Sequence, residues 1–457
     1  MNICTILTGS RGHDLPCKLA WAKPLEQKGH NVFIVGRTKQ QDIISMYGDP
    51  HTVYRLSLQQ DMEKWLGVPY SYIGTLDWRT FNRQSHTDTK NTEQVNQYLT
   101  FLTIWFQHFY ITNKIDALVF IFESFPWNLI AYYVARKMGI PVINIMGTRF
   151  PKRGIMLGDN GNTFIHNWNN NPDPEWEEIT SLYQERTFNK IKGVGLSNFW
   201  SPQNLQNNLS KALQYIKTQK SMSNISPYEK TALPPLWGEI DKVIWSTLKS
   251  FTNPIFWEKV RDEEYFFYPF HLEDDANVSL AEPFTSQVEL IKGISRSLPV
   301  NVKLYIKPHP VYKGADMRIK DLLTLSELKN VRIIDPSVSS VSVINKAIGL
   351  ITLNSTAGFE AMILNKPVIS LGHDFYCHPN LLYLVREWHD LPKTILEVYK
   401  ERKPLASTET VELFAKFIYK NTIFTQGDVA YAEDPFTPSD GERIAFAIGK
   451  ICGKLLQ

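Results

Sequence analysis

Cysteine and net charge are both scarce in this chain of 457 residues. None of its 4 cysteines forms a C-x-x-C pair, which argues against a disulfide framework or a structural zinc site and favours reduced thiols. The 49 lysines and arginines nearly balance the 46 aspartates and glutamates, so that the net charge is +3. This balance argues against a nucleic-acid-binding protein, whose contact surface needs an excess of basic residues.

Long apolar runs and N-terminal targeting signals are also missing. The longest uncharged apolar stretch, residues 98–113, contains Gln107 and His108 and is shorter than the ~20 apolar residues of a membrane-spanning helix. Residues 1–9 lack the basic start of a signal peptide and have the pattern of a first strand. We therefore expect a cytoplasmic protein, for which peripheral contact with the inner membrane stays an open alternative.

The chain does contain a regular alternation of strand-length apolar runs and helix-length segments. Hydrophobic residues make up 43% of it, enough for a buried core in each of two or three domains. Strands separated by helices of roughly 10–15 residues are typical of right-handed βαβ units in a parallel sheet. In the first region we predict strands at 3–8, 31–36, 117–122 and 141–146, with helices at 16–28 and 127–138.

A second alternating region extends from residue 265 to residue 371, and a block without strand candidates precedes it. We therefore predict an α/β fold with two Rossmann-like parallel-sheet lobes that face a cleft. Ligands of such sheets lie at the carboxyl ends of the strands. The predicted parts are an N-terminal lobe at 1–165, a helical insertion at 166–262, a C-terminal lobe at 263–390, and C-terminal helices at 391–457 that pack across the lobes.

A histidine between two prolines follows one predicted strand of the second lobe. The strand 302–306 leads into Lys307, Pro308, His309 and Pro310, and the prolines end the strand and restrict the direction of the histidine. An imidazole in this place can donate to a phosphate as charge develops on it. Lys307 supplies a positive charge nearby.

The predicted strand 350–353 ends in a small polar cluster that begins a helix. Ser and Thr at a helix start leave backbone N–H groups free to bind an anion. An ordinary helix cap by Ser355 would give the same pattern. Glu360, one turn into the helix, is placed to reach ribose hydroxyls or to complement the helix dipole. The candidate anion-binding residues are Asn354, Ser355, Thr356, Ala357 and Gly358, with His373 after the next strand.

The first lobe offers candidates for a general base. Gly12, His13 and Asp14 join the first strand to the first helix, and a histidine at a strand end can accept a proton near neutral pH. Asp14 can do the same or orient His13. Glu123 follows the strand 117–122 as a second candidate, or serves only as a helix N-terminal charge.

Three further residues complete the set of candidates. Arg149 follows the strand 141–146 and can pair with a carboxylate or phosphate. His271 and Asp275 follow the first strand of the second lobe and can contact acceptor or sugar hydroxyls. The acidic residues near Asp275 lack the partner spacing of a metal site, so we predict no metal.

In combination these motifs resemble the C-terminal half of bacterial capsule polysaccharide biosynthesis proteins, which are Kdo-transferase-like glycosyltransferases of GT-B architecture. The resemblance covers roughly residues 265–380. The loop at Gly12 and His13, with Gly29-His30-x-Val after it, resembles the N-terminal lobe of GT-B enzymes that use nucleotide sugars. The segments that carry the first resemblance are Tyr268-Pro-Phe-His271, Leu304-Tyr-Ile-Lys307-x-His309-Pro310, Ser355-Thr-Ala-Gly-Phe-Glu360-Ala and Lys366-Pro-Val-Ile-x-x-Gly372-x-x-Phe375-Tyr376.

The resemblance implies an inverting, metal-independent transfer from a nucleotide sugar, which is a substrate, so that no cofactor is expected. It places the donor in the C-terminal lobe, with His309, Ser355 and Thr356 on the phosphate and Glu360 on the nucleotide side. The N-terminal lobe would take a carbohydrate or lipid-linked acceptor, with His13 as the base. Where the capsule Kdo-transferases carry Glu-Asp-Gly, this chain has Gly147-Thr-Arg149, so that family supplies neither the base nor a CMP-Kdo donor, and His13 as the base comes from the N-terminal resemblance.

Two other functions remain open at this point. The same fold serves nucleotide-sugar epimerases and hydrolases, which act on the donor without an acceptor. A non-catalytic protein of capsule assembly would bind carbohydrate and show no nucleotide-dependent stabilisation.

Overall fold

The chain divides into two compact units, each built on its own sheet. One comprises Met1–Glu175, Ser226–Leu233 and Lys416–Gln457, and the other Trp176–Ile225 and Pro234–Ala415. The predicted helical block 166–262 lies mostly outside the described residues. The computed structural model describes residues 1–7, 14–36, 53–55, 92–121, 126–150, 154–158, 165, 173–184, 253–271, 286–309, 317–427 and 436–455.

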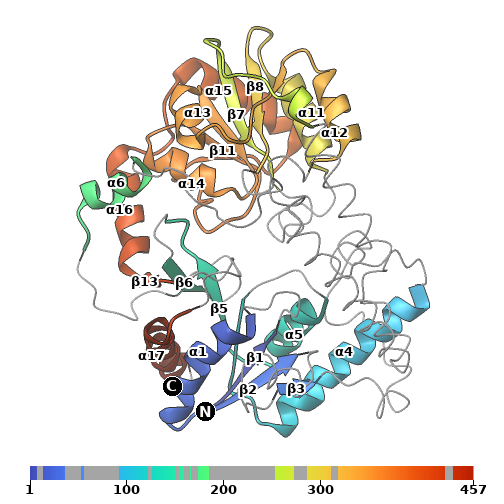
Figure 1. Ribbon diagram of the computed structural model, residues 1–457, viewed down its shortest axis with the longest axis vertical. Coiled ribbons are helices and arrows are strands. Elements are labelled where there is room, and N and C mark those ends of the chain that lie inside the picture. The colour runs from blue at the N-terminus through green and yellow to red at the C-terminus, as the bar shows by residue number, and fades with distance from the viewer. Residues whose placement is uncertain are drawn as a thin grey trace, which may run out of the picture. The chain divides into compact units, whose positions relative to one another are not determined.

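Within the described residues the first unit contains a seven-stranded sheet in the order β13-β6-β5-β4-β1-β2-β3 (Figure 1). The strands from β5 to β3 pair in parallel, and β6 pairs antiparallel with both β5 and β13. The chain begins at β1 in the middle and builds outward on both sides, which is the doubly wound arrangement. The strands are β1 (Asn2–Ile6), β2 (Asn31–Gly36), β3 (Val53–Arg55), β4 (Ala117–Phe120), β5 (Val142–Gly147), β6 (Gly154–Gly158) and β13 (Ile423–Phe424).

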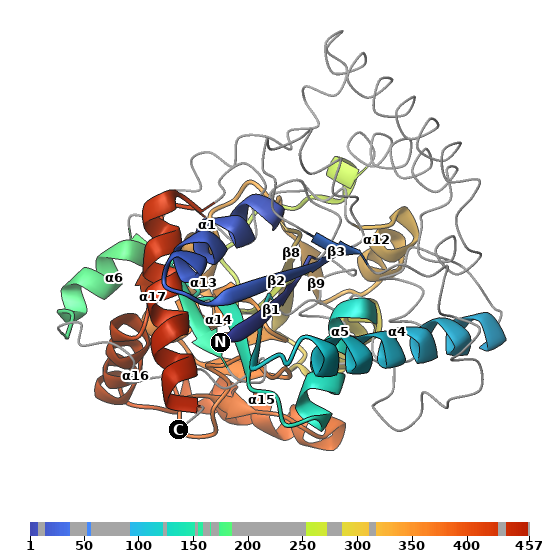
Figure 2. The ribbon, with the colours of Figure 1, turned by 90° about the horizontal axis from the view of Figure 1, so that it is seen from below.

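Alternating side chains of these strands fill two cores, one on each face of the sheet. Ile3 and Ile34 pack with helices α1 (Asp14–Gln27) and α17 (Pro438–Leu455), which lie side by side (Figure 2). Cys4 and Val35 point to the opposite face and pack with α4 (Thr92–Thr112) and α5 (Pro126–Lys137). The burial of both faces explains why the strands are continuous apolar runs.

The second unit contains a six-stranded sheet in which every described pair is parallel, in the order β12-β11-β10-β7-β8-β9. Its first strand, β7, lies in the middle. The chain continues through β8 and β9 on one side and then through β10, β11 and β12 on the other, so the strand order reverses between β7 and β10. The strands are β7 (Tyr265–Pro269), β8 (Lys303–Lys307), β9 (Val331–Ile333), β10 (Gly349–Thr352), β11 (Val368–Ser370) and β12 (Tyr383–Leu384).

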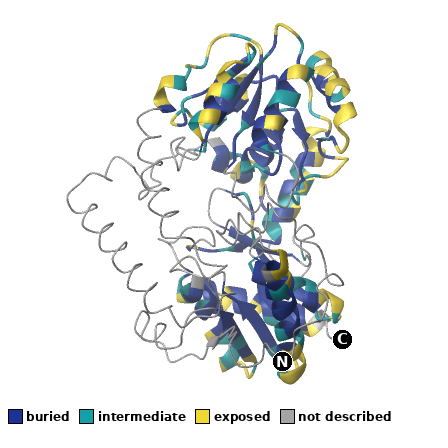
Figure 3. Ribbon diagram, turned by 90° about the vertical axis from the view of Figure 1, so that its right-hand side faces the viewer, coloured by how far each residue is buried: buried dark blue, intermediate teal, exposed yellow. Residues whose placement is uncertain are grey.

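Helices cover both faces of this second sheet, and its strands are buried (Figure 3). Phe266, Leu304 and Ile351 share a core with α11 (Gln287–Ser297), α12 (Ile319–Ser326) and α15 (Leu391–Glu401). On the opposite face Tyr265 and Tyr305 stack with their ring centroids 3.9 Å apart. The remaining helices of the unit are η5 (Asn253–Phe256), α6 (Trp176–Gln184), α13 (Ser340–Lys346), α14 (Thr356–Ile363) and η7 (Trp388–Asp390), while α16 (Thr408–Lys420) contains the boundary between the units.

The predicted α/β fold with two parallel-sheet lobes is confirmed, and most predicted elements lie within a few residues of the observed ones. The antiparallel strands β6 and β13 are absent from the prediction, as is helix α4. Gly158 is the last residue of β6 and is buried. The first sheet is therefore mixed, with an antiparallel edge on a parallel core.

Candidate functional site

Several residues predicted for the donor, and His271, which was predicted to contact acceptor or sugar hydroxyls, lie at the ends of strands of the second sheet. His271 follows β7, Lys307 and His309 end and follow β8, Asn354 follows β10, and His373 follows β11. Because these strands are parallel neighbours, their carboxyl ends meet at one edge of the sheet. The order of the strands reverses between β7 and β10, and this reversal is the place where open α/β sheets bind ligands.

His271 is fixed at the switch point by Gln287, the first residue of α11. The backbone N–H of His271 donates to Gln287 Oε1 at 2.9 Å, and Gln287 Nε2 donates back to the His271 carbonyl at 2.9 Å. Tyr268 Oη donates to the same Oε1 at 3.2 Å. Both Gln287 and His271 are buried, so a reciprocal amide clamp holds the strand end in place.

Lys307 and His309 lie beside this clamp, on the neighbouring strand. Lys307 pairs with Pro269 in the sheet register, and its carbonyl accepts from the Phe270 amide at 2.9 Å. The Lys307 side chain is buried, whereas His309, two residues beyond, is half-buried. The histidine thus leaves the sheet at its edge with part of its surface accessible.

The N-terminus of α14 lies on the other side of β7. Ser355 is the N-cap, and its Oγ accepts from the Ala357 amide at 3.2 Å. The Ser355 amide itself donates to Thr352 Oγ1 at 3.1 Å. The amide of Thr356 donates to no atom of the described residues, and Thr356 is half-buried. A free N–H at the positive end of a helix dipole is suited to an anion.

A tyrosine from the following loop supports this helix start. Tyr376 is fully buried, and its Oη donates to the Ser355 carbonyl at 2.6 Å. Gly358 leaves the space for the tyrosine, since a Cβ built there would lie 2.6 Å from Tyr376 Oη. The glycine of the Ser-Thr-Ala-Gly motif is therefore explained by a close approach between two parts of the site.

Asn354 and His373 join the ends of β10 and β11. The His373 amide donates to Asn354 Oδ1 at 2.7 Å, and a Cβ at Gly372 would collide with that oxygen and with the Leu353 carbonyl. Arg386 also donates to the Gly372 carbonyl, at 2.7 Å. The amide oxygen of Asn354 thus has a structural partner, and the His373 side chain is exposed.

Glu360, Lys366 and Cys377 lie behind the rim of the site. Glu360 is buried in α14, and its predicted contact with ribose stays a prediction. Lys366 donates to the Asn345 carbonyl at 2.7 Å, so this motif lysine stabilises the loop before β10. Burial raises the pKa of the Cys377 thiol to about 11, which keeps it protonated at neutral pH.

The candidates of the first unit are described only in part. Gly12, His13 and Glu123 lie outside the described residues, and so does Asp275 of the second unit. Asp14 begins α1, and its side chain lies outside the described part.

The strands that lead to the first-unit candidates are described. β1 ends at Ile6 and pairs with β4, which ends at Phe120. These neighbours flank the point at which the strand order of the first sheet reverses.

Arg149 lies in the hairpin that connects β5 and β6, and not in a strand-to-helix connection. It has a φ of 67°, and the neighbouring Thr148 amide donates to the Gly154 carbonyl at 3.2 Å. A positive φ is unusual for a non-glycine residue and is typical of a tight turn. Phe150, next to it, is buried against Tyr419, with ring centroids 5.2 Å apart.

Gln287 and Tyr376 are the supporting residues that sequence reasoning missed. The signal for Gln287 was a glutamine directly after a helix-capping Ser286, on the apolar side of a helix. Tyr376 belongs to the segment that carries the family resemblance, but nothing in its spacing indicates a bond to Ser355. Both act through backbone groups of residues distant in the sequence.

Neither a metal cluster nor a membrane span is found in the described ranges. No group of three or more His, Cys, Asp or Glu side chains there gathers as metal ligands would. Likewise, none of the described helices is long and apolar enough to cross a bilayer.

The similarity to solved structures is weak. The β Kdo 2,7 transferase KpsC of Thermosulfurimonas dismutans is 14% identical, with 92% of this chain and 99% of that chain covered and a TM-score of 0.35. The UDP-GlcNAc 2-epimerase of Methanocaldococcus jannaschii is 17% identical with the same coverage and a TM-score of 0.31. Likenesses of this size assign no function.

The sequence comparisons are more specific but cover only part of the chain. The capsule polysaccharide modification protein LipB, from Neisseria meningitidis serogroups A and B, is 25% identical over 126 residues, 26% of this chain and 30% of LipB. The match therefore spans less than a third of the curated relatives. Residues 203–383 match the family model of capsule polysaccharide biosynthesis proteins. The resemblance to this family, expected from residues 265–380, is thus confirmed for the segment that carries the site.

Proposed function

We propose that this protein is a glycosyltransferase that moves a sugar from a nucleotide-sugar donor to a surface or capsular polysaccharide precursor. One observation carries the proposal. His309 and the N-terminus of α14 follow the strands that flank β7, at the switch point of a doubly wound sheet. A half-buried imidazole and a free helix amide at one sheet edge suit the phosphate of a donor.

The proposed chemistry is a single displacement at the anomeric carbon. The acceptor hydroxyl attacks this carbon, its proton passes to a base, and the bond between the carbon and the phosphate oxygen breaks. Negative charge then develops on the departing nucleotide. The Thr356 amide and the His309 imidazole would stabilise that charge.

The supports of the site hold these groups in place before the donor binds. Gln287 fixes the end of β7, and Tyr376 and Ser355 fix the first turn of α14. Groups that are already oriented need no rearrangement as charge develops. The proposed role of Gln287 and Tyr376 is positioning, because both are buried and bond to backbone groups of the site.

We assign the acceptor to the first unit and the role of base to His13, with Glu123 and Asp275 as reserves. A single displacement inverts the anomeric configuration. Positive charge from the helix terminus and His309 would make a metal unnecessary, so the transfer is proposed to be metal-independent. The family match of residues 203–383 supports the capsule-related acceptor.

Two measurements test the proposal. A thermal-shift screen of CMP, UDP, GDP and dTDP sugars should find one donor that raises the melting temperature. Mass spectrometry with this donor and a glycan acceptor should then detect a product extended by one sugar. The absence of any stabilising nucleotide sugar would contradict the proposal and favour a non-catalytic assembly protein.

A reaction with the donor alone distinguishes the proposed transferase from an epimerase or hydrolase of the same fold. An epimerase or hydrolase changes the nucleotide sugar without acceptor, whereas the proposed transferase requires both. His309→Ala should abolish transfer while the protein stays folded. His389→Ala is the matched control, because His389 is an exposed residue of η7 and follows no strand of the switch point.

A further inference from the structure

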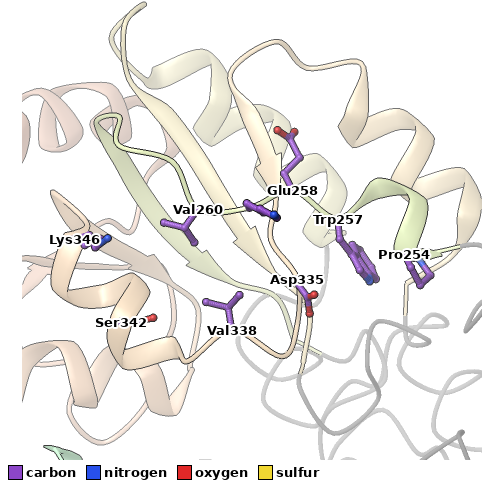
Figure 4. Close-up of a pocket in the computed structure, with 9 residues that line it drawn as sticks. Pro254, Trp257, Glu258, Val260, Asp335, Val338, Ser342 and Lys346 are labelled. Atoms are coloured by element: carbon purple, nitrogen blue, oxygen red, sulfur yellow. The ribbon is translucent and has the colours of Figure 1, made fainter.

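A cavity of about 480 Å³ lies on the second unit, beside helix α13 (Figure 4). Its walls come from the segment 254–260, from the loop after β9, and from α13 itself. Its volume falls within the range of small-molecule sites. Nothing in the proposed transfer mechanism uses it.

One wall of this cavity is apolar and carries an indole. Trp257 and Pro254 stand together, and Val260 and Val338 face each other across the opening (Figure 4). Trp257 is only half-buried, so its ring keeps an accessible surface. An indole with polar groups around it is suited to the C–H face of a sugar ring, and it loses little entropy on binding.

The charged groups of the cavity favour an anion. Lys259 and Lys346 are exposed, and neither forms an ion pair within the described part of the chain. Glu258 carries opposite charge, but it pairs with Arg261 at 2.9 Å and with Arg332 at 3.4 Å. The two unpaired lysines face one further carboxylate, that of Asp335, so the cavity keeps a small excess of positive charge, which attracts a carboxylate.

Asp335 adds a group that can accept hydrogen bonds from a ligand. Its Oδ1 accepts from the Ser337 amide at 2.8 Å and from Ser337 Oγ at 2.6 Å. These bonds fix the direction of the carboxylate in the cavity wall. A fixed carboxylate is a good acceptor for sugar hydroxyls.

None of the residues that line the cavity belongs to the predicted donor set. Asp335 and Val338 follow the carboxyl end of β9, the neighbour of β8, and the cavity extends from there along α13 as far as Lys346. The site therefore fits part of a longer molecule or a second ligand.

We propose that this cavity binds an acidic saccharide, one or two sugar units that carry a carboxylate. Trp257 contacts the face of a sugar ring, and Lys259 and Lys346 attract the sugar carboxylate. Asp335 accepts hydrogen bonds from the sugar hydroxyl groups. The site would hold part of a glycan chain on the second unit.

The test measures the binding of digalacturonate to the full chain. Saturation-transfer NMR and calorimetry detect this binding in the absence of nucleotide. Galactobiose, the neutral counterpart of the same disaccharide, is the control ligand. The wild type should bind digalacturonate at least about tenfold more tightly than galactobiose. Trp257→Ala and Lys346→Gln should each weaken digalacturonate binding about tenfold.

Lys393→Gln is the control variant, because Lys393 is an exposed lysine of α15 that does not line the cavity. It should bind as the wild type does. Failure of digalacturonate to bind, equal affinity for both disaccharides, or unchanged binding by Trp257→Ala would each overturn the proposal. Since no nucleotide is present, the result does not depend on the proposed transferase activity.

Discussion

Replacing Tyr376 by phenylalanine should loosen the start of α14 without disturbing the core around it. The Tyr376 ring is fully buried and lies against Phe359 and Phe375, with centroid distances of 5.9 and 5.6 Å. Phenylalanine keeps these contacts. The substitution removes the hydroxyl that donates to the Ser355 carbonyl at 2.6 Å.

The size of the stability loss depends on the hydrogen bonds that the Ser355 carbonyl retains in the variant. Ser355 O also accepts from the Gly358 amide at 2.9 Å, so it does not become an unsatisfied buried group. The expected loss is that of one net hydrogen bond, about 1 kcal/mol in the free energy of unfolding. For a unit of this size such a loss lowers the melting temperature by about 2–4 °C.

Tyr265→Phe is a closely matched control. Tyr265 Oη donates to the Val343 carbonyl at 2.8 Å, and that carbonyl also accepts from the Ala347 amide at 3.1 Å. The two variants should therefore lose similar stability in urea denaturation. Only Tyr376→Phe touches the helix that would hold the donor.

The decisive comparison is the affinity for the donor nucleotide. Calorimetry should show a loss of about three- to tenfold for Tyr376→Phe and none for Tyr265→Phe. If both variants lose stability and both keep full affinity, the hydroxyl is purely structural and the positioning argument is refuted.

Three other changes test different parts of the account. Gly372→Ala should destabilise the second unit by about 1–3 kcal/mol in urea denaturation and abolish donor binding, because its Cβ collides with Asn354 at the strand ends. Gln287→Ala should lower kcat more than it changes KM, since it frees the end of β7 and leaves the donor contacts intact. Asp440→Asn should destabilise the first unit by about 1–3 kcal/mol at neutral pH, and this difference should shrink as the pH falls.

The sign of the Asp440 effect follows from its environment. Burial raises the pKa of this carboxyl, but hydrogen bonds from the Thr437, Gln426 and Gly427 amides outweigh burial and lower it. A lowered pKa in the folded state contributes stability above the pKa of the unfolded chain, and that stability is lost as the pH falls through the folded value. The free energies of unfolding of the wild type and Asp440→Asn, measured by urea denaturation, should converge as the pH falls through this acidic range. A difference that stays constant with pH would contradict the stabilising role of the ionised Asp440 carboxylate.

Strand positions were readable from the sequence because both faces of each sheet are buried. The runs 302–306 and 350–353 are mostly apolar and are followed by prolines or small polar residues, so the residues after them were placed correctly at the sheet edge. No strand order was predicted from the sequence; the observed order, which puts β7 between β8 and β10, agrees with the rule for doubly wound sheets.

The missed elements lack such a signal. β6 is a five-residue run that pairs with β5 through a hairpin, and β13 has 2 residues and pairs with β6, a strand distant in the sequence. Helix α4 is apolar on most of its surface, because it packs its aromatic side chains into a core, so no clear amphipathic period appears.

The clamps of the site were unpredictable for a related reason. Gln287 bonds to a backbone 16 residues away, and Tyr376 to one 21 residues away. Residue type and spacing predict which groups lie at a strand end. They do not predict which buried side chain from the next helix or loop will bond to the backbone there.

The most direct measurement compares a nucleoside diphosphate with its free nucleoside, binding to the wild type and to His309→Ala. Both ligands should carry the nucleobase of the donor that the thermal-shift screen identifies. Loss of a charge-assisted hydrogen bond should weaken the nucleotide about 10–100-fold and leave the nucleoside unchanged. Equal affinity of both proteins for the nucleotide would contradict the claim that His309 holds the donor phosphate.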